Sequence, residues 1–341
     1  MAAGTIRLLV VDDSIYMQMA IRAMVAIHRE IEIVGEATNG EQAVEMALRL
    51  KPDVITMDVN MPGLDGLEAT RRIMAQAPTR IVMLSSLTEK GATTTFRALE
   101  LGAVDYVPKS SSAIDVDLAT IAEEVASKIR FWGKQGTDTK EAADDVLPAL
   151  PGGTDILVIA AGSGSPLLVS ALLRAIAPLL FPVLVVQEMP ANFTSSFVDF
   201  VARTTGHPTR EDLHRSILAP STVTVMPGGR QGSVSRDQVG MLNLKLGISA
   251  SAGRDEDELI ISAVAAAQAP VMIMLSGEAR PLDRLAAAWA GEGGALWVQS
   301  PESCVVEALP RAAIATGLAK TVVEPQSLVA ALQHGMERSA A

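Results

Sequence analysis

A short apolar run that ends in a single carboxylate constrains this sequence more than any other feature. Residues 54–57 read Val-Ile-Thr-Met, Asp58 follows, and residues 59–66 contain one proline and two glycines. An apolar run bounded by turn signals is typical of a strand that is covered on both faces. Open α/β sheets build their sites at the carboxyl ends of such strands. Asp58 is therefore the first candidate for a reactive group.

The residues around this run alternate between strand-like and helix-like patterns. This alternation of strands and helices predicts a parallel, doubly wound sheet. A further helix is expected over 114–132. The other strand candidates are 6–11, 31–37, 80–84 and 105–107, and the helix candidates between them include 41–50 and 67–75.

The composition changes over residues 133–153, which we interpret as a linker. The predicted domains are therefore 1–132 and 154–341. A chain of 341 residues is long enough for two cores. In the second half, strands are expected at 156–161, 183–187, 222–226, 271–276 and 295–299, and helices at 167–177, 195–204, 256–268 and 281–290.

The overall charge limits the classes of partner. A net charge of −11 argues against a general nucleic-acid or membrane-surface binder. The apolar runs are strand-sized, so membrane insertion is not expected. Cys304 is the single cysteine, which excludes an internal disulfide and fits a reducing compartment. The first residues lack a signal-peptide h-region, and the expected location is the cytoplasm.

Polar side chains stand at the ends of four predicted strands: Asp12 with Asp13, then Asp58, Ser85 and Lys109. Phosphoryl transfer to a carboxylate needs a divalent cation, and hard oxygen ligands suit Mg²⁺. Asp13 and Asp58 could hold this ion, with Asp12 acting directly or through water. Lys109 would supply positive charge, Ser85 a hydroxyl donor and Asp58 the nucleophile. The alternative reading of the acidic pair is a solvated helix start.

The spacing of these groups, together with Met61-Pro-Gly63 and Asp65-Gly66, resembles the receiver domain of two-component response regulators. Residues 85–91 and 97–107 look more specifically like the receiver of the chemotaxis methylesterase CheB. The resemblance covers roughly residues 5–130 and implies a flavodoxin-like fold and a chemotaxis-type sensor histidine kinase that phosphorylates Asp58.

The same resemblance makes Ser85 and Tyr106 a switch pair that responds, with Lys109, to the phosphate. One departure is Ser110, because the family lysine is usually followed by proline. A cis peptide bond is far less favoured before serine, so the loop geometry behind Lys109 is in question.

Residues 155–330 resemble the CheB effector domain, most clearly over 186–197, 226–229 and 302–311. This resemblance implies a Rossmann-like parallel-sheet domain. In the family, the domain hydrolyses γ-glutamyl methyl esters on chemoreceptors and deamidates certain receptor glutamines. It resembles a serine hydrolase, with a nucleophile, a base and an orienting aspartate.

The family's catalytic positions are altered in this chain. The nucleophile turn, usually Gly-Ala-Ser-Thr-Gly-Gly, reads Ala161-Gly-Ser-Gly-Ser-Pro166, so Ser163 is the retained serine. The family histidine is replaced by Glu188, and Pro281 stands at the family aspartate. A glutamate with an ordinary pKa of about 4.3 is a poor base for a hydroxyl. The sequence therefore predicts a degenerate triad with only the serine left.

Several functions stay open at this point. His207, His214 or Asp283 could replace a lost triad member, and Cys304 is expected to be a buried apolar residue. The favoured hypothesis is a pseudoenzyme that acts on a chemoreceptor or another signalling protein through binding, controlled by phosphorylation of Asp58. The alternatives are an active methylesterase/glutamine amidase that uses Ser163 with a displaced base, and a phosphate sink.

Overall fold

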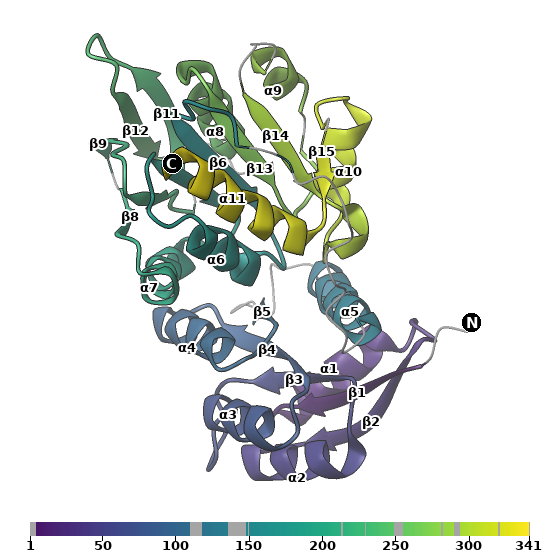
Figure 1. Cartoon of the computed structure of the whole chain (residues 1–341). Helices are drawn as coiled ribbons and strands as arrows, with labels where there is room; N and C mark the ends of the chain where they lie inside the picture. The colour runs from purple at the N-terminus through teal and green to yellow at the C-terminus, as the bar shows by residue number, and fades with distance from the viewer. Residues whose placement is uncertain are drawn as a thin grey trace. The chain divides into compact units, whose positions relative to one another are not determined.

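The computed structural model describes residues 5–109, 118–135, 148, 150–212, 214–228, 230–248, 255–280, 282–289, 294–319 and 321–340. The chain divides into two compact units, Met1–Thr139 and Lys140–Ala341 (Figure 1). Most of the predicted linker 133–153 lies outside the described residues, and its boundaries stay a prediction.

The first unit is built on a five-stranded parallel sheet with the order β2-β1-β3-β4-β5. This arrangement confirms the doubly wound sheet. The last two strands run two residues further than expected, so Ser85 and Lys109 are strand residues. The strands are β1 (Ile6–Val11), β2 (Ile31–Ala37), β3 (Val54–Asp58), β4 (Arg80–Ser86) and β5 (Asp105–Lys109).

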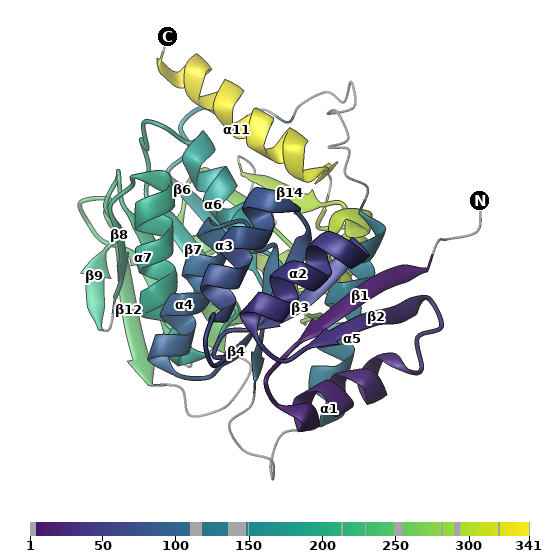
Figure 2. The same cartoon turned by 90° about the horizontal axis from the view of Figure 1, so that it is seen from below.

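Five helices surround this sheet within the described residues: α1 (Ile15–Val25), α2 (Gly40–Leu50), α3 (Gly66–Gln76), α4 (Glu89–Glu100) and α5 (Leu118–Lys134). Helix α1 packs against α5, whereas α2 packs against α3 and α3 against α4 (Figure 2). Four of the helices begin at a residue whose side-chain oxygen accepts a backbone N–H of the first turn: Ser14, Asn39, Asp65 and Thr88. Such caps fix where each helix starts after its strand.

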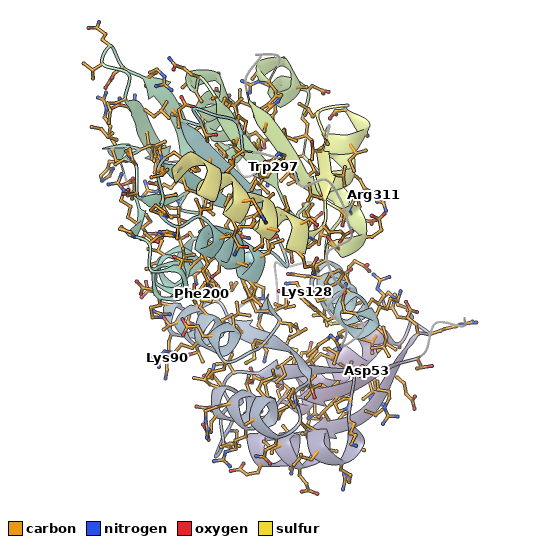
Figure 3. The ribbon with its side chains drawn as sticks, viewed as in Figure 1. Asp53, Lys90, Lys128, Phe200, Trp297 and Arg311 are labelled. Carbon is orange, nitrogen blue, oxygen red and sulfur yellow. The ribbon has the colours of Figure 1, made fainter. Side chains whose placement is uncertain are left out.

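The second unit contains a seven-stranded parallel sheet with the order β15-β14-β13-β6-β7-β10-β8. Trp297 of β14 is 2% exposed in its core (Figure 3). The strands are β6 (Ile156–Ala161), β7 (Val183–Gln187), β8 (Thr209–Glu211), β10 (Val223–Val225), β13 (Pro270–Met274), β14 (Ala295–Gln299) and β15 (Thr321–Val323).

The helices of this unit are α6 (Pro166–Ala175), α7 (Thr194–Thr205), α8 (Asp255–Ala266), α9 (Asp283–Ala288), α10 (Ala308–Ala315) and α11 (Pro325–Ala340). Helix α6 packs against α7 and α11, and α8 packs against α9. No helix in the described parts of the chain is both long and apolar enough to cross a membrane.

A three-stranded antiparallel sheet with the order β11-β12-β9 was not expected from the sequence. It is formed by β9 (Arg215–Ile217), β11 (Arg230–Arg236) and β12 (Leu242–Ile248). A turn at Asp237 joins the two longer strands, and the Asp237 carboxylate accepts the backbone N–H groups of Val239 and Met241. This sheet packs against α8.

Candidate phosphoacceptor site and effector-domain positions

Asp58 is the last residue of β3, and β3 lies between β1 and β4 in the sheet. Asp12 directly follows β1, so the topology brings it beside Asp58. Asp12 and Asp58 are buried and Asp13 is exposed, and one carboxylate oxygen from each lies within 4.8 Å of the others. The structure thus assembles the predicted acidic cluster at one edge of the sheet, with hard oxygen atoms of the kind that Mg²⁺ prefers.

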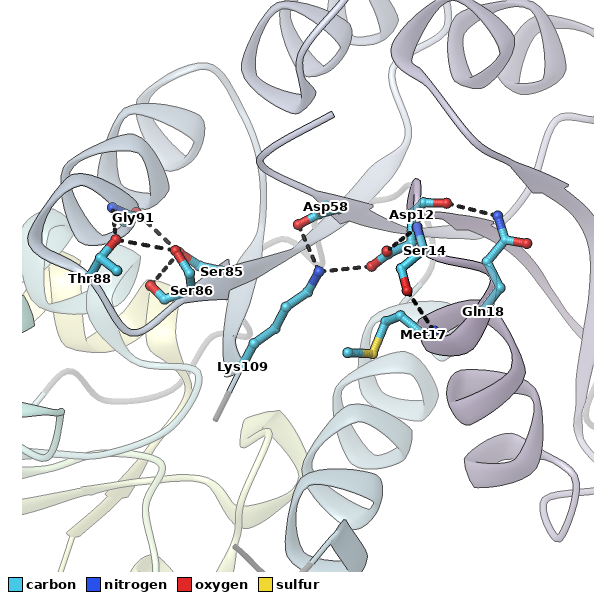
Figure 4. Close-up of polar contacts among 10 residues, drawn as sticks. All are labelled: Asp12, Ser14, Met17, Gln18, Asp58, Ser85, Ser86, Thr88, Gly91 and Lys109. Carbon is cyan, nitrogen blue, oxygen red and sulfur yellow. Dashed lines mark hydrogen bonds and ion pairs between the residues drawn. The ribbon is translucent and has the colours of Figure 1, made fainter. Parts of the chain in front are cut away.

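Lys109, at the end of β5, reaches across to this cluster (Figure 4). Its Nζ donates to Asp12 Oδ2 and to Asp58 Oδ1, both at 2.8 Å. The backbone around Asp12 is held as well, because Gln18 Nε2 donates to the Asp12 carbonyl and Ser14 N donates to Asp12 Oδ1. The lysine is therefore placed to balance negative charge on the carboxylate that would carry a phosphoryl group.

The environment of Asp58 disfavours its ionised form. Burial raises the pKa of the Asp58 carboxyl above its ordinary value, and the neighbouring charge of Asp12 adds to the rise. The Lys109 ammonium and a backbone hydrogen bond with Asn60 oppose the rise without cancelling it. Strain of this kind is typical of functional sites, where charge is held for chemistry rather than for stability.

This raised pKa predicts how stability depends on pH. A carboxyl group whose pKa is higher in the folded state makes the fold less stable as pH rises through that folded pKa. With a chelator present, we expect Asp58→Asn to raise the melting temperature at pH 7. The gain should vanish below about pH 4, where the unfolded carboxyl is also protonated.

A suitable control for this measurement is Asp237→Asn, because hydrogen bonds from Asn243 and from backbone N–H groups lower the Asp237 pKa. Its substitution should change the melting temperature at pH 7 in the opposite direction. A lower melting temperature of Asp58→Asn at pH 7 would contradict the prediction.

The predicted switch residues lie on neighbouring strands. Ser85 on β4 is fully buried, and its Oγ donates to the Gly91 carbonyl at 3.1 Å (Figure 4). Tyr106 on β5 is 6% exposed, and its ring meets Phe96 of α4 edge to face with centroids 5.9 Å apart. Both side chains are packed against α4, and their switch role stays a prediction.

Lys128 of α5 is a buried charge that the sequence analysis missed (Figure 3). Its ammonium lies 3.2 Å from Asp105 and 2.9 Å from Glu124, and it donates to the Tyr106 carbonyl. Burial alone would lower the Lys128 pKa, but the two carboxylates outweigh burial and raise it. A signal was available, because Lys128 stands in the apolar stripe formed by Val125, Ile129 and Trp132.

Ser163 lies in the turn between β6 and α6 and is partly buried. Its carbonyl accepts a hydrogen bond of 2.6 Å from Ser276 Oγ. The cap position of α6 is Ser165, whose hydroxyl donates instead to the Ser276 carbonyl. Gly162 N also donates to that carbonyl, at 2.7 Å. Ser276 therefore fixes the backbone of the whole turn.

Glu188 follows β7 and is exposed, and its carboxylate lies close to the backbone of Gly162. A Cβ atom added at Gly162 would lie 3.2 Å from Glu188 Oε2 and 2.7 Å from the Gly277 Cα. Arg280 Nη2 lies 3.7 Å from Glu188 Oε2, and Arg280 Nη1 lies 3.4 Å from Asp257. No sequence pattern had indicated Gly162 or Arg280 as neighbours of Glu188, and the triad role of Ser163 stays a prediction.

The proposed substitute residues are placed as follows. His207 Nε2 contacts the Leu173 carbonyl at 2.9 Å. Leu173 stands eight residues beyond Ser165, which is about 12 Å along α6 and away from the serine turn. His214 precedes β9, and its carbonyl accepts from Leu246 N. Asp283 is the exposed first residue of α9, and Pro281 lies outside the described residues.

Cys304 is buried, as expected for an apolar cysteine. Burial, with smaller contributions from nearby glutamates, raises its pKa to about 12. A thiol of this kind is mostly protonated near neutral pH and is a poor nucleophile.

Two family descriptions match the chain: a CheB methylesterase domain over residues 157–332 and a response regulator receiver domain over residues 8–120. A protein-glutamate methylesterase/protein-glutamine glutaminase of Nocardioides is 33% identical, over 93% of this chain and 92% of its own length. A protein of Saccharophagus degradans with the same name, numbered 1, is 30% identical over 93% of this chain and 96% of its own length.

Solved structures resemble each half separately. The response regulator domain of Thermotoga maritima CheB is 46% identical, covers 39% of this chain and 98% of its own, and has a TM-score of 0.36. The methylesterase catalytic domain of Thermotoga maritima CheB is 21% identical, covers 53% of this chain and 98% of its own, and has a TM-score of 0.49.

A parallel sheet that gathers two buried aspartates, an exposed one and a lysine at one edge, joined to a second α/β unit, defines a two-domain response regulator. The chain belongs to the CheB methylesterase family, with an N-terminal receiver domain and a C-terminal methylesterase domain.

Proposed function

We propose that this response regulator is phosphorylated on Asp58 by a chemotaxis-type histidine kinase and acts through binding, with a methylesterase domain that is catalytically impaired. The proposal is carried by Glu188, which stands beside the Gly162–Ser163 turn where the family resemblance leads one to expect a histidine base. The chain thus has a carboxylate in place of the imidazole at this position.

The receiver half of the proposal rests on the chemistry of the acidic cluster. Asp12, Asp13 and Asp58 present oxygen ligands that fit Mg²⁺, which would offset negative charge on the incoming phosphoryl group. Asp58 supplies the attacking oxygen. Lys109 Nζ, at 2.8 Å from Asp58 Oδ1, is positioned to hold an oxygen of the transferred group.

The effector half rests on what Glu188 can do. Glu188 Oε2 lies 3.7 Å from Arg280 Nη2. A glutamate has no imidazole ring, so an aspartate cannot orient it through a ring N–H as it orients a histidine base. The absence of an imidazole at this position supports binding rather than turnover.

Phosphorylation can control binding without any hydrolysis. A two-state protein needs only different contacts in its two states for a covalent charge change to shift their populations. We propose a chemoreceptor or another signalling protein as the partner, as the resemblance to the CheB family implies.

The direct test is methanol release from methylated chemoreceptor membranes. The full-length protein, treated with Mg²⁺ and acetyl phosphate, should release no more methanol than a sample without protein. Ser163→Ala should behave identically. An active methylesterase of the family provides the positive control for the membranes.

A rate well above background that Ser163→Ala abolishes would overturn the proposal. It would favour the second candidate, an active methylesterase/glutaminase, which the names of the similar proteins support. A phosphate sink, the third candidate, requires rapid loss of phosphate from Asp58, so a long-lived phosphoprotein would exclude it.

A further inference from the structure

The small antiparallel sheet of the second unit has one buried and one exposed face. Leu242, Leu244 and Leu246 of β12 are buried in the core beside Val234 of β11. Side chains alternate along a strand, so the residues between these leucines point the other way. The register places three rows on the exposed face: Gln231 with Gly247; Ser233, Lys245 and Arg215; and Ser235, Asn243 and Ile217.

Two cations stand directly opposite each other in the middle row. Lys245 of β12 pairs with Arg215 of β9 in the antiparallel register, and both side chains are exposed. Like charges in this arrangement destabilise a sheet. Within the described parts of the chain, neither cation forms an ion pair with an acidic side chain. The repulsion between the Lys245 and Arg215 side chains therefore destabilises the sheet locally, and an anionic partner would relieve it.

Three acidic side chains near this sheet are already engaged. Asp237 accepts from Asn243 Nδ2 and from backbone N–H groups in the turn. Asp212 accepts from Ser216 and pairs with Arg210, and Asp155 pairs with Arg236. The three strands themselves contain four basic residues and no acidic one, in a chain of net charge −11.

The neighbours of the two cations are hydrogen-bonding groups and one apolar side chain. Ser233 flanks Lys245 on the other side, and Asn243 and Ser235 lie one row away. Ile217, two residues from Arg215, is 46% exposed. Arginine is among the residues that are enriched in protein–protein interfaces.

We propose that this face, formed by Arg215, Ile217, Ser233, Asn243 and Lys245, docks an acidic segment of a partner protein through glutamate carboxylates. Two cations on a strongly acidic chain are too few for nucleic acid or for an anionic membrane, which bind through many basic groups. A protein segment needs only a few carboxylates matched to the pair, with an apolar residue over Ile217.

This inference specifies the chemical groups by which the protein would recognise the partner in the proposed function. It rests on the proposed function for the identity of that partner. Glutamate carboxylates carry charge, whereas their methyl esters and the glutamine amide do not. The face would therefore bind a segment whose glutamates are free and bind it weakly when they are esterified or amidated.

Fluorescence anisotropy with a labelled helical peptide tests this inference. The probe carries glutamates along one face, and a matched peptide has glutamine at the same positions. At low salt, the full-length protein should bind the glutamate peptide at least tenfold more tightly than the glutamine peptide. Lys245→Glu/Arg215→Glu should lower the affinity for the glutamate peptide at least tenfold.

Lys90→Glu on α4 is the control, because Lys90 is an exposed cation of the other unit (Figure 3). It should leave the affinity within twofold of the original protein. Circular dichroism establishes whether the double variant is folded. If the two charge reversals disturb the sheet, Lys245→Gln alone replaces them and should lower the affinity for the glutamate peptide by a smaller factor.

Equal affinity for the two peptides, an unchanged affinity of the folded double variant or an equal loss with Lys90→Glu would overturn the inference. Tighter binding to a DNA oligonucleotide or to phosphatidylserine vesicles would also overturn it. Because no turnover is measured, these outcomes are independent of methanol release and separate a failed docking face from a failed proposal about catalysis.

Discussion

Asp58→Asn should reduce incorporation of labelled phosphate to the background of a sample without protein, a loss of at least 100-fold. The substitution keeps the size of the side chain, but an amide is neither the attacking oxygen nor a charged ligand for the cation. The measurement is transfer of label to the full-length protein in Mg²⁺, from a phosphorylated chemotaxis-type kinase and from acetyl phosphate.

The control is Asp199→Asn, an exposed aspartate on α7 in the other unit. It should incorporate label at the original rate. Substantial labelling of Asp58→Asn that resists removal of Mg²⁺ would show that another side chain accepts the phosphate.

Lys128→Met should destabilise the receiver unit by roughly 3–5 kcal/mol, because removing one partner leaves the Asp105 carboxylate as an uncompensated buried charge. Asp105 and Lys128 side chains are 1% and 3% exposed, so water would replace the lost ammonium poorly. Thermal or urea unfolding of the full-length protein gives the size of the loss.

Two further variants show whether the buried charge is the cause. Lys90→Met removes an exposed lysine and should change stability by less than about 0.5 kcal/mol. In Lys128→Met/Asp105→Asn the buried charge is gone, so part of the lost stability should return. If the double variant is no more stable than Lys128→Met, lost packing rather than charge is the explanation.

Much of the fold followed from local sequence patterns. Apolar runs such as 54–57 and 156–161 have the length of strands and stand between helical spacings, so the two parallel sheets were predictable. The β11–β12 hairpin was missed although Leu242, Leu244 and Leu246 alternate with polar residues, the usual signal of a half-buried strand. The glycine at position 240 was a sequence signal for its turn, and in the structure Gly240 has a φ of 87°, which favours glycine.

The acidic cluster of the first unit could be predicted from the sequence, whereas the surroundings of Glu188 in the second unit could not. Asp12, Asp58 and Lys109 end neighbouring parallel strands, so their approach follows from topology alone. The closeness of the Glu188 carboxylate to the Gly162 backbone depends on the direction of a side chain and on the course of a turn, and neither leaves a pattern in the sequence. Arg280 comes from a loop whose course no periodicity predicts.

The strand order places Asp58, the proposed phosphoacceptor, close to one edge of its sheet. Asp58 ends β3, Ser85 lies on β4, and Lys109 ends β5, the edge strand. Two strand spacings, roughly 10 Å, separate the first from the last. If Asp58 is phosphorylated as proposed, a displacement of Lys109 alone would already be a displacement at the edge strand of the sheet.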